Sequence, residues 1–346
     1  MTTPPLPRLA AAALAVLAVN APNARAEDTP PPAPTAQATP APAPEPEDDD
    51  AQEPAAPEPT IANAAFTEAM KSPPEDVVKR CGKPVAGMEE VLSPGMVLLL
   101  GEMHGTREVP AFVGTVGCHV ASAGVPVVVG LELPREEQRA LRHYLRSNGD
   151  GEARAALVEG AFWRRPYQDG RSSEAIVELV EKLRALRARG LSVSVFTYDA
   201  PGQGSQRAAA MARRVLEVRK TAPRSTFLLV GGNVNARTMR GTEWDETFTP
   251  MGWHLARAKL PLRVLDVRFS RGTAWTCNLG EQGKLSCGAT PAVPPAFHLG
   301  DKVIFRGPRA FVELTPEHAH EGYDGVFYVG PVNASPPAVA ITAQAQ

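Results

Sequence analysis

Short apolar runs alternate with helix-like segments between residues 96 and 270, and this alternation limits the fold more than any other feature. The runs are rich in valine and leucine and are too short to be ordinary helices. Such an order predicts an α/β domain with a mostly parallel sheet and helices on both faces. The predicted strands are Met96–Leu100, Pro126–Leu133, Leu191–Tyr198, Ser225–Val230 and Leu262–Phe269.

The clearest predicted helix is Ser173–Arg189, where apolar residues recur at helical spacing from Ile176 to Leu186. Gly190 follows it as a typical helix-ending residue. The other helices are recognised by their start and stop residues or by one apolar face. They are Ile61–Lys71, Val109–Ala123, Pro134–Arg146, Glu152–Val158, Gln206–Val218 and Met251–Ala258.

The composition changes after residue 270. Short strand-like runs at 302–306 and 325–329 are separated by Gly and Pro. We expect a β-rich C-terminal elaboration of the same domain. A single domain would then span residues 61–346, with its α/β core at about 93–270.

The first 60 residues differ from the rest. Residues 1–26 have the features of a secretory signal: Arg8, the apolar run Leu9–Val19 and an A-x-A cleavage site at 24–26. The run is too short to span a bilayer, so we expect no transmembrane span after cleavage; an uncleaved anchor is the alternative. Residues 27–60 are Pro/Ala-rich and acidic, which predicts a disordered linker. We therefore expect an exported protein, periplasmic or extracellular, of the bacterial cell envelope.

Charge argues against a nucleic-acid partner. The chain has a net charge of −2, but residues 27–60 hold nine acids and no base, which leaves the domain at about +5. This excess is mild, and no dense basic patch is interleaved with aromatic residues. The sequence also has no P-loop, no serine nucleophile elbow and no Rossmann glycine fingerprint. No motif reports the oligomeric state.

Four cysteines in an exported chain predict disulfides rather than metal or redox chemistry, since none has a C-x-x-C or zinc-ligand spacing. Cys277 and Cys287 flank a short Gly-containing segment and would staple a hairpin. The second pair would then be Cys81–Cys118, although three pairings are formally possible.

Polar side chains follow four of the predicted strands. Because the carboxyl ends of parallel strands meet at one edge of a sheet, we expect them to lie close together. Two carboxylates and an imidazole suit a divalent metal, or general-base activation of water by the imidazole. A strand-end acid also often serves structure alone, by capping a helix or pairing with an arginine. The residues are Glu102, His104, Glu132, Asp199, Asn233 and Asn235.

An aromatic and basic loop at 162–171 is predicted to form a wall over these strand ends. Arg171 would receive an anionic group and Tyr167 would stack on a ring, or ligate haem. The alternative is an ordinary loop whose aromatics, Trp163 among them, pack on the core. Arg237, just past the fourth strand, is a further candidate anion contact. An H-x-H pattern at 318–320 would bind metal only on a strand, and a solvated turn is favoured there.

The motif Gly101-Glu102-Met103-His104, its continuation Gly-Thr-Arg-Glu, and Gly130-Leu131-Glu132 resemble the Tiki/TraB, erythromycin-esterase and ChaN-like superfamily. In that superfamily a first strand ends in G-E-x-H, a second in Glu, and a later strand in G-x-x-H or G-N-x-H. The chain resembles the ChaN-like and esterase-like members most. Here Asn235 stands where the third motif has His.

The resemblance implies one fold and several activities. Esterase-like members hydrolyse esters with the first-motif His and the acids, Tiki-like members are metal-dependent peptidases, and ChaN-like members bind haem. Asn is a weak ligand beside His, so Asn235 disfavours the metallopeptidase. It leaves the esterase-like set His104, Glu102 and Glu132 intact.

The leading hypothesis is an esterase-like hydrolase with His104 as general base and Glu102 and Glu132 orienting it. The same three residues would be the ligands if a metal is bound. Substrate contacts are expected from Arg171, Arg237, Asn233, Asn235, Asp199 and Tyr167. The alternatives are a haem- or ligand-binding uptake protein, with haem or a divalent metal as cofactor, and an inactive family member. The partner is accordingly a small-molecule substrate or haem.

Overall fold

The computed structural model describes residues 63–279, 283–293 and 309–340. The predicted signal, the linker and the predicted strand at 302–306 lie outside these residues. Among the helices that are described, none is both long and apolar enough to cross a membrane.

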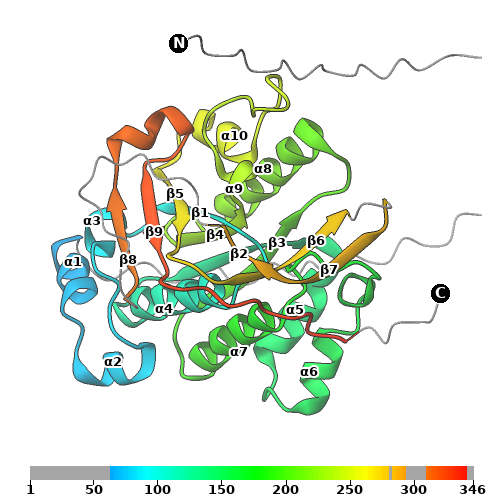
Figure 1. Ribbon diagram of the computed structural model, residues 1–346. Coiled ribbons are helices and arrows are strands. Elements are labelled where there is room, and N and C mark those ends of the chain that lie inside the picture. Colours follow the sequence, from blue (N-terminus) through cyan, green and yellow to red (C-terminus); the bar gives the residue numbers. More distant parts are fainter. Residues whose placement is uncertain (1–62, 280–282, 294–308, 341–346) are drawn as a thin grey trace, which may run out of the picture. The chain divides into compact units, whose positions relative to one another are not determined.

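A seven-stranded sheet forms the centre of the domain (Figure 1). Its strand order is β3-β2-β4-β1-β5-β9-β8, and every pairing is parallel except that of β9 with the edge strand β8. The mostly parallel sheet is confirmed, and six of its strands have ends close to those predicted, whereas β8 was not predicted. The strands are β1 Val97–Glu102, β2 Val127–Pro134, β3 Val193–Asp199, β4 Thr226–Gly232, β5 Leu262–Arg268, β8 Phe311–Leu314 and β9 Gly325–Tyr328.

Helices cover both faces of the sheet, as predicted. One face packs on α4 Glu108–Ser122, α5 Gln138–Arg146 and α7 Glu174–Ala188, and the other on α8 Gly204–Thr221, α9 Asn233–Ala236 and α10 Met251–Arg257. Successive side chains of β1 alternate between the two cores, with Leu98 in the first and Leu99 in the second. This double burial explains why the strands read as unbroken apolar runs.

Short elements complete the fold. The helices α2 and α3 were not predicted, because helices of seven and four residues carry too little periodicity to be recognised. The 3-10 segments η2 and η3 lie where a loop and a turn were predicted. The short elements are α1 Asn63–Lys71, α2 Glu75–Cys81, α3 Met88–Val91, η1 Arg135–Glu137, α6 Gly151–Leu157, η2 Ala161–Arg164 and η3 Pro316–Glu321.

Both predicted disulfides are present. Cys81 at the end of α2 is bonded to Cys118 of α4. Cys277 is bonded to Cys287, and the two lie directly opposite each other in an antiparallel hairpin of β6 Thr273–Leu279 and β7 Leu285–Pro291. The predicted β-rich elaboration is therefore this hairpin together with the β8–β9 edge of the main sheet.

The β6–β7 hairpin and the last described residues both form hydrogen bonds with the turn after β1. Gly105 O accepts hydrogen bonds from Trp275 N of β6 at 2.9 Å and from Ser335 N at 2.8 Å. Residues 332–339, here called the C-terminal strap, also bridge Thr106 and Ser173. Three segments that are distant in sequence therefore meet around Gly105.

Gly105→Ala should destabilise the domain more than Gly190→Ala. Both glycines have a left-handed backbone, with φ of 85° and 82°, so each substitution carries a strain of about 1 kcal/mol. A Cβ at Gly105 would in addition strike the backbone of Trp275, whereas one at Gly190 meets nothing within 4 Å. Denaturant unfolding measures both free energies. Equal losses would show that the fold does not depend on this close approach.

Candidate functional site

Glu102, His104 and Glu132 lie together at the carboxyl ends of β1 and β2. His104 Nδ1 is 2.8 Å from Glu102 Oε1, and His104 Nε2 is 3.8 Å from Glu132 Oε2. Both carboxylates are buried, while 23% of the His104 side chain is exposed. The three residues predicted to be catalytic are thus brought together, and the imidazole is the one that solvent reaches most.

Two glycines at the end of β4 make room for this contact. β4 lies between β2 and β1 in the sheet, so Glu132 and His104 meet across its end. A Cβ on Gly231 would lie 2.9 Å from Glu132 Oε2, and one on Gly232 would lie 3.2 Å from His104 Nε2. The N–H of Gly232 also donates to Glu132 Oε2 at 2.9 Å. The glycine pair therefore both spaces and anchors the site.

Two arginines hold the other oxygen of Glu132. Arg207 donates to Oε1 at 2.7 Å, and Arg171 lies 3.5 Å from the same atom. Asp199 joins them, since its carboxylate accepts from Arg207 Nε at 2.8 Å and from Arg171 Nη1 at 2.9 Å. Hydrogen bonds between ionised groups are stronger than those between neutral groups, so the carboxylate of Glu132 has a fixed position.

These cations decide the ionisation of Glu132. Burial alone would raise its pKa, but the charges of His104, Arg171 and Arg207 outweigh that effect and lower it below the ordinary value. Glu132 therefore stays a carboxylate at neutral pH. Nearby, burial raises the pKa of Tyr198 well above its ordinary value, and this phenol donates to Val230 O at 2.5 Å beneath the site.

His104 has a defined tautomer when it is neutral. A carboxylate only accepts hydrogen bonds, so Nδ1 carries the proton toward Glu102 and the lone pair is on Nε2. Burial favours the neutral ring, but the hydrogen bond and charge of Glu102, with the charge of Glu132, outweigh it and raise the pKa of His104 above 6.5. Protonated His104 thus stabilises the fold fully below about pH 6.5, and this contribution is lost as the pH rises through the raised pKa.

The loop predicted to form a wall over the strand ends supplies Arg171 to the site. Asp169 fixes that side chain by accepting from Arg171 Nη2 at 2.7 Å and from Arg165 at 2.5 Å. Burial favours the neutral acid, but the two arginines hold the pKa of Asp169 well below its ordinary value. The guanidinium of Arg171 is therefore held in a fixed position by Asp169.

The aromatic residues of this loop divide between core and surface. Trp163 is fully buried and donates from its indole N–H to Glu137 at 2.9 Å, so it packs in the core, as the alternative interpretation of the loop held. Tyr167 is 46% exposed. Its contact with a ligand stays a prediction.

The residues after β4 have mainly local contacts. Asn233 Oδ1 accepts from the next backbone N–H at 2.9 Å, at the start of α9, and Asn235 is half-buried within that helix. Arg237 donates to the carbonyl oxygens of Glu321 at 2.8 Å and Gly241 at 2.9 Å. Its guanidinium thus ties two loops together, and a role in binding substrate stays a prediction.

Sequence reasoning missed Arg207, Asp169 and the spacing role of Gly231 and Gly232. The signal for Arg207 is its place in the first turn of a helix that directly follows a strand ending in an acid, Asp199. The first turn of such a helix lies at the carboxyl edge of the sheet, where the site is. No local pattern shows, however, that Arg207 would reach Glu132.

A cation does not fit these residues well. Arg207, Arg171 and the N–H of Gly232 already occupy the oxygens of Glu132, and two guanidinium groups repel a metal ion. Within the described ranges, no three His, Cys, Asp or Glu side chains form a group that could hold a metal. The H-x-H pattern lies in the 3-10 turn η3 rather than on a strand, as favoured. A metal on Glu102, His104 and Glu132, and haem binding, stay predictions.

Glu102→Gln should lower the pKa of His104, because it removes the charge that Nδ1–H binds. NMR titration of the imidazole carbons measures this directly. His119 is an internal control, since it is buried on α4 and its pKa is lowered chiefly by burial. An unchanged His104 titration would show that Glu102 does not hold the ring in solution.

Comparison with known proteins places the fold but not the activity. No protein-family model matches the sequence, and no curated protein matches it. A mutant of the erythromycin esterase EreC in its open conformation is similar in structure, with a TM-score of 0.55 and 12% identity over 71% of this chain and 93% of that one. A succinoglycan biosynthesis protein has a TM-score of 0.49 and 10% identity over 80% of this chain and 98% of that one. The chain thus has the fold of erythromycin esterase.

Proposed function

We propose that the protein is an exported hydrolase that cleaves an ester at the carboxyl ends of β1 and β2. The observation that carries this proposal is the orientation of His104, whose Nδ1 is bound to Glu102, whose Nε2 faces Glu132 and whose side chain is partly exposed. An acid that orients an imidazole for proton transfer is the arrangement that general-base catalysis requires. The fold of a solved erythromycin esterase supports an ester as the substrate class.

In this mechanism neutral His104 takes a proton from water at Nε2. The water oxygen attacks the ester carbonyl, and the resulting tetrahedral intermediate expels the alkoxide. The imidazolium returns its proton to the alkoxide, so the products are an acid and an alcohol. Glu102 keeps the ring in the tautomer whose lone pair is on Nε2.

Glu132 would stabilise the imidazolium that forms during the reaction. Its carboxylate lies 3.8 Å from Nε2 and is kept ionised by Arg171 and Arg207. The arginines are positioning residues in this scheme, because they act through Glu132. Substrate contacts of Arg171, Asp199, Tyr167, Asn233 and Asn235 belong to the proposal, and Arg237 is its weakest member because its N–H groups bind backbone carbonyls.

Export is part of the proposal. It rests on the signal-like residues 1–26 and is compatible with two disulfides, which persist in oxidising compartments. The competing function is binding of haem or another ligand at the same strand ends. A Soret band on haem addition without ester turnover would favour that alternative.

His104→Ala should lower kcat/KM by about 10²–10⁴-fold, the usual contribution of a general base. The assay is hydrolysis of p-nitrophenyl acetate and of a macrolide lactone by the full chain. His143→Ala is the matched control, since His143 is an exposed residue of α5. Equal turnover by wild type and His104→Ala would place the chemistry elsewhere.

The rate should rise with pH, because only neutral His104 accepts a proton. The midpoint of kcat/KM should lie above 6.5, in line with the raised pKa of His104 in the free protein. Glu102→Gln should move this midpoint to lower pH and reduce the plateau. A pH profile that falls through this range would contradict a general base at His104.

A further inference from the structure

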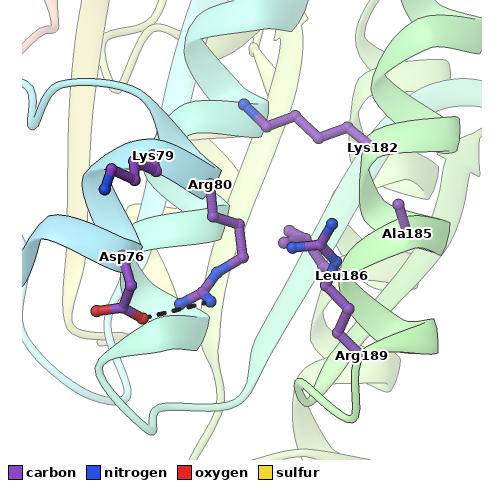
Figure 2. Close-up of a pocket in the computed structure, with 7 residues that line it drawn as sticks. All are labelled: Asp76, Lys79, Arg80, Lys182, Ala185, Leu186 and Arg189. Carbon is purple, nitrogen blue, oxygen red and sulfur yellow. Dashed lines mark ion pairs between the residues drawn. The ribbon is translucent and has the colours of Figure 1, made fainter.

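A cavity lies away from the candidate site. It has a volume of about 480 Å³ and is lined by residues of α2 and α7 and by Arg189 directly after α7, none of which belongs to the Glu102–His104–Glu132 group. Figure 2 shows Arg80, Lys182 and Arg189 extending into the space between the two helices. This size is ordinary for a pocket that takes a small organic ligand.

The charge of this cavity is unbalanced. Its lining has the basic side chains Lys79, Arg80, Lys182 and Arg189 and the single acid Asp76. Asp76 is 3.7 Å from Arg80, an exposed contact of little strength. The surplus of positive charge favours an anion.

Lys79 is a minor part of this surplus. It forms an exposed ion pair with Glu75 at 2.7 Å on the same helix. The charges that matter are therefore those of Arg80, Lys182 and Arg189.

Two of the three cations, Arg80 and Lys182, are held by contacts with α4. Arg80 Nη2 donates to Ser122 of α4 at 3.2 Å, while its Nε is buried and has no partner among the described residues. The stem of Lys182 passes over Gly114, where an added Cβ would lie 2.9 Å from its Cδ.

Lys182 is half-buried on the wall of this cavity. Its ammonium lies 3.4 Å from Thr115 Oγ1. Burial lowers the pKa of Lys182, and a bound anion would offset that cost.

The combination of two guanidinium groups and one ammonium group indicates which kind of anion the cavity would bind. Guanidinium forks and an ammonium together suit the several oxygens of a phosphoryl group better than one carboxylate does. Leu186, buried on α7, supplies an apolar wall for the organic part of such a ligand. We infer that the cavity between α2 and α7 binds a phosphate monoester, free or as a lipid headgroup, through Arg80, Lys182 and Arg189.

Isothermal titration of the full chain with glycerol phosphate tests this site. Combined Lys182→Gln and Arg189→Gln should weaken binding by about ten- to a hundredfold, since each removes a charge-assisted hydrogen bond. The double variant should fold, because Arg189 is exposed and Lys182 has no carboxylate partner within the described chain. Arg213→Gln is the matched control, since Arg213 is exposed on α8 over the opposite face of the sheet.

Sedimentation with phosphatidylcholine vesicles, with and without phosphatidic acid, separates the two sources of the phosphate. If wild type binds glycerol phosphate and the double variant does not, the ligand is a soluble phosphate ester. Binding only to vesicles with phosphatidic acid, again lost in the double variant, identifies a lipid headgroup. Absence of both, or equal binding by the double variant and wild type, overturns the site. Ester turnover should be unchanged in the double variant, so this test is independent of the proposed hydrolase.

Discussion

The carboxylate of Glu132 is buried, and it can keep its charge only because donors surround it. Arg207 comes from α8, Arg171 from the loop after η2, and the N–H of Gly232 from the end of β4. Removing all of these donors would leave an uncompensated buried charge, which costs several kcal/mol. The arrangement of four chain segments around the strand ends is therefore tied to this one group.

The acidic strand ends were predictable because a parallel sheet brings the carboxyl ends of its strands to one edge. That rule places Glu102, Glu132 and Asp199 together without any knowledge of side-chain packing. It does not say which arginines neutralise them, since Arg207 is 75 residues from Glu132 in sequence. Long side chains reach partners that only the packed helices define.

The C-terminal region was predicted only in outline. The hairpin followed from the spacing of Cys277 and Cys287, because a short loop between two cysteines favours facing strands. The insertion of β9 beside β5, and the path of the C-terminal strap, depend on contacts between distant segments. Local patterns carry no signal for such contacts, so β9 was expected, but neither β8 nor the order of the strands was.

The turn after β1 is early in the chain but is completed late. The carbonyl of Gly105 meets its partners only when Trp275 and Ser335 are in place. A polypeptide that leaves the ribosome, or crosses a membrane, from its N-terminus therefore contains His104 long before the surroundings of that histidine exist. The turn beside His104 therefore stays incomplete in the nascent chain until Ser335 has been made.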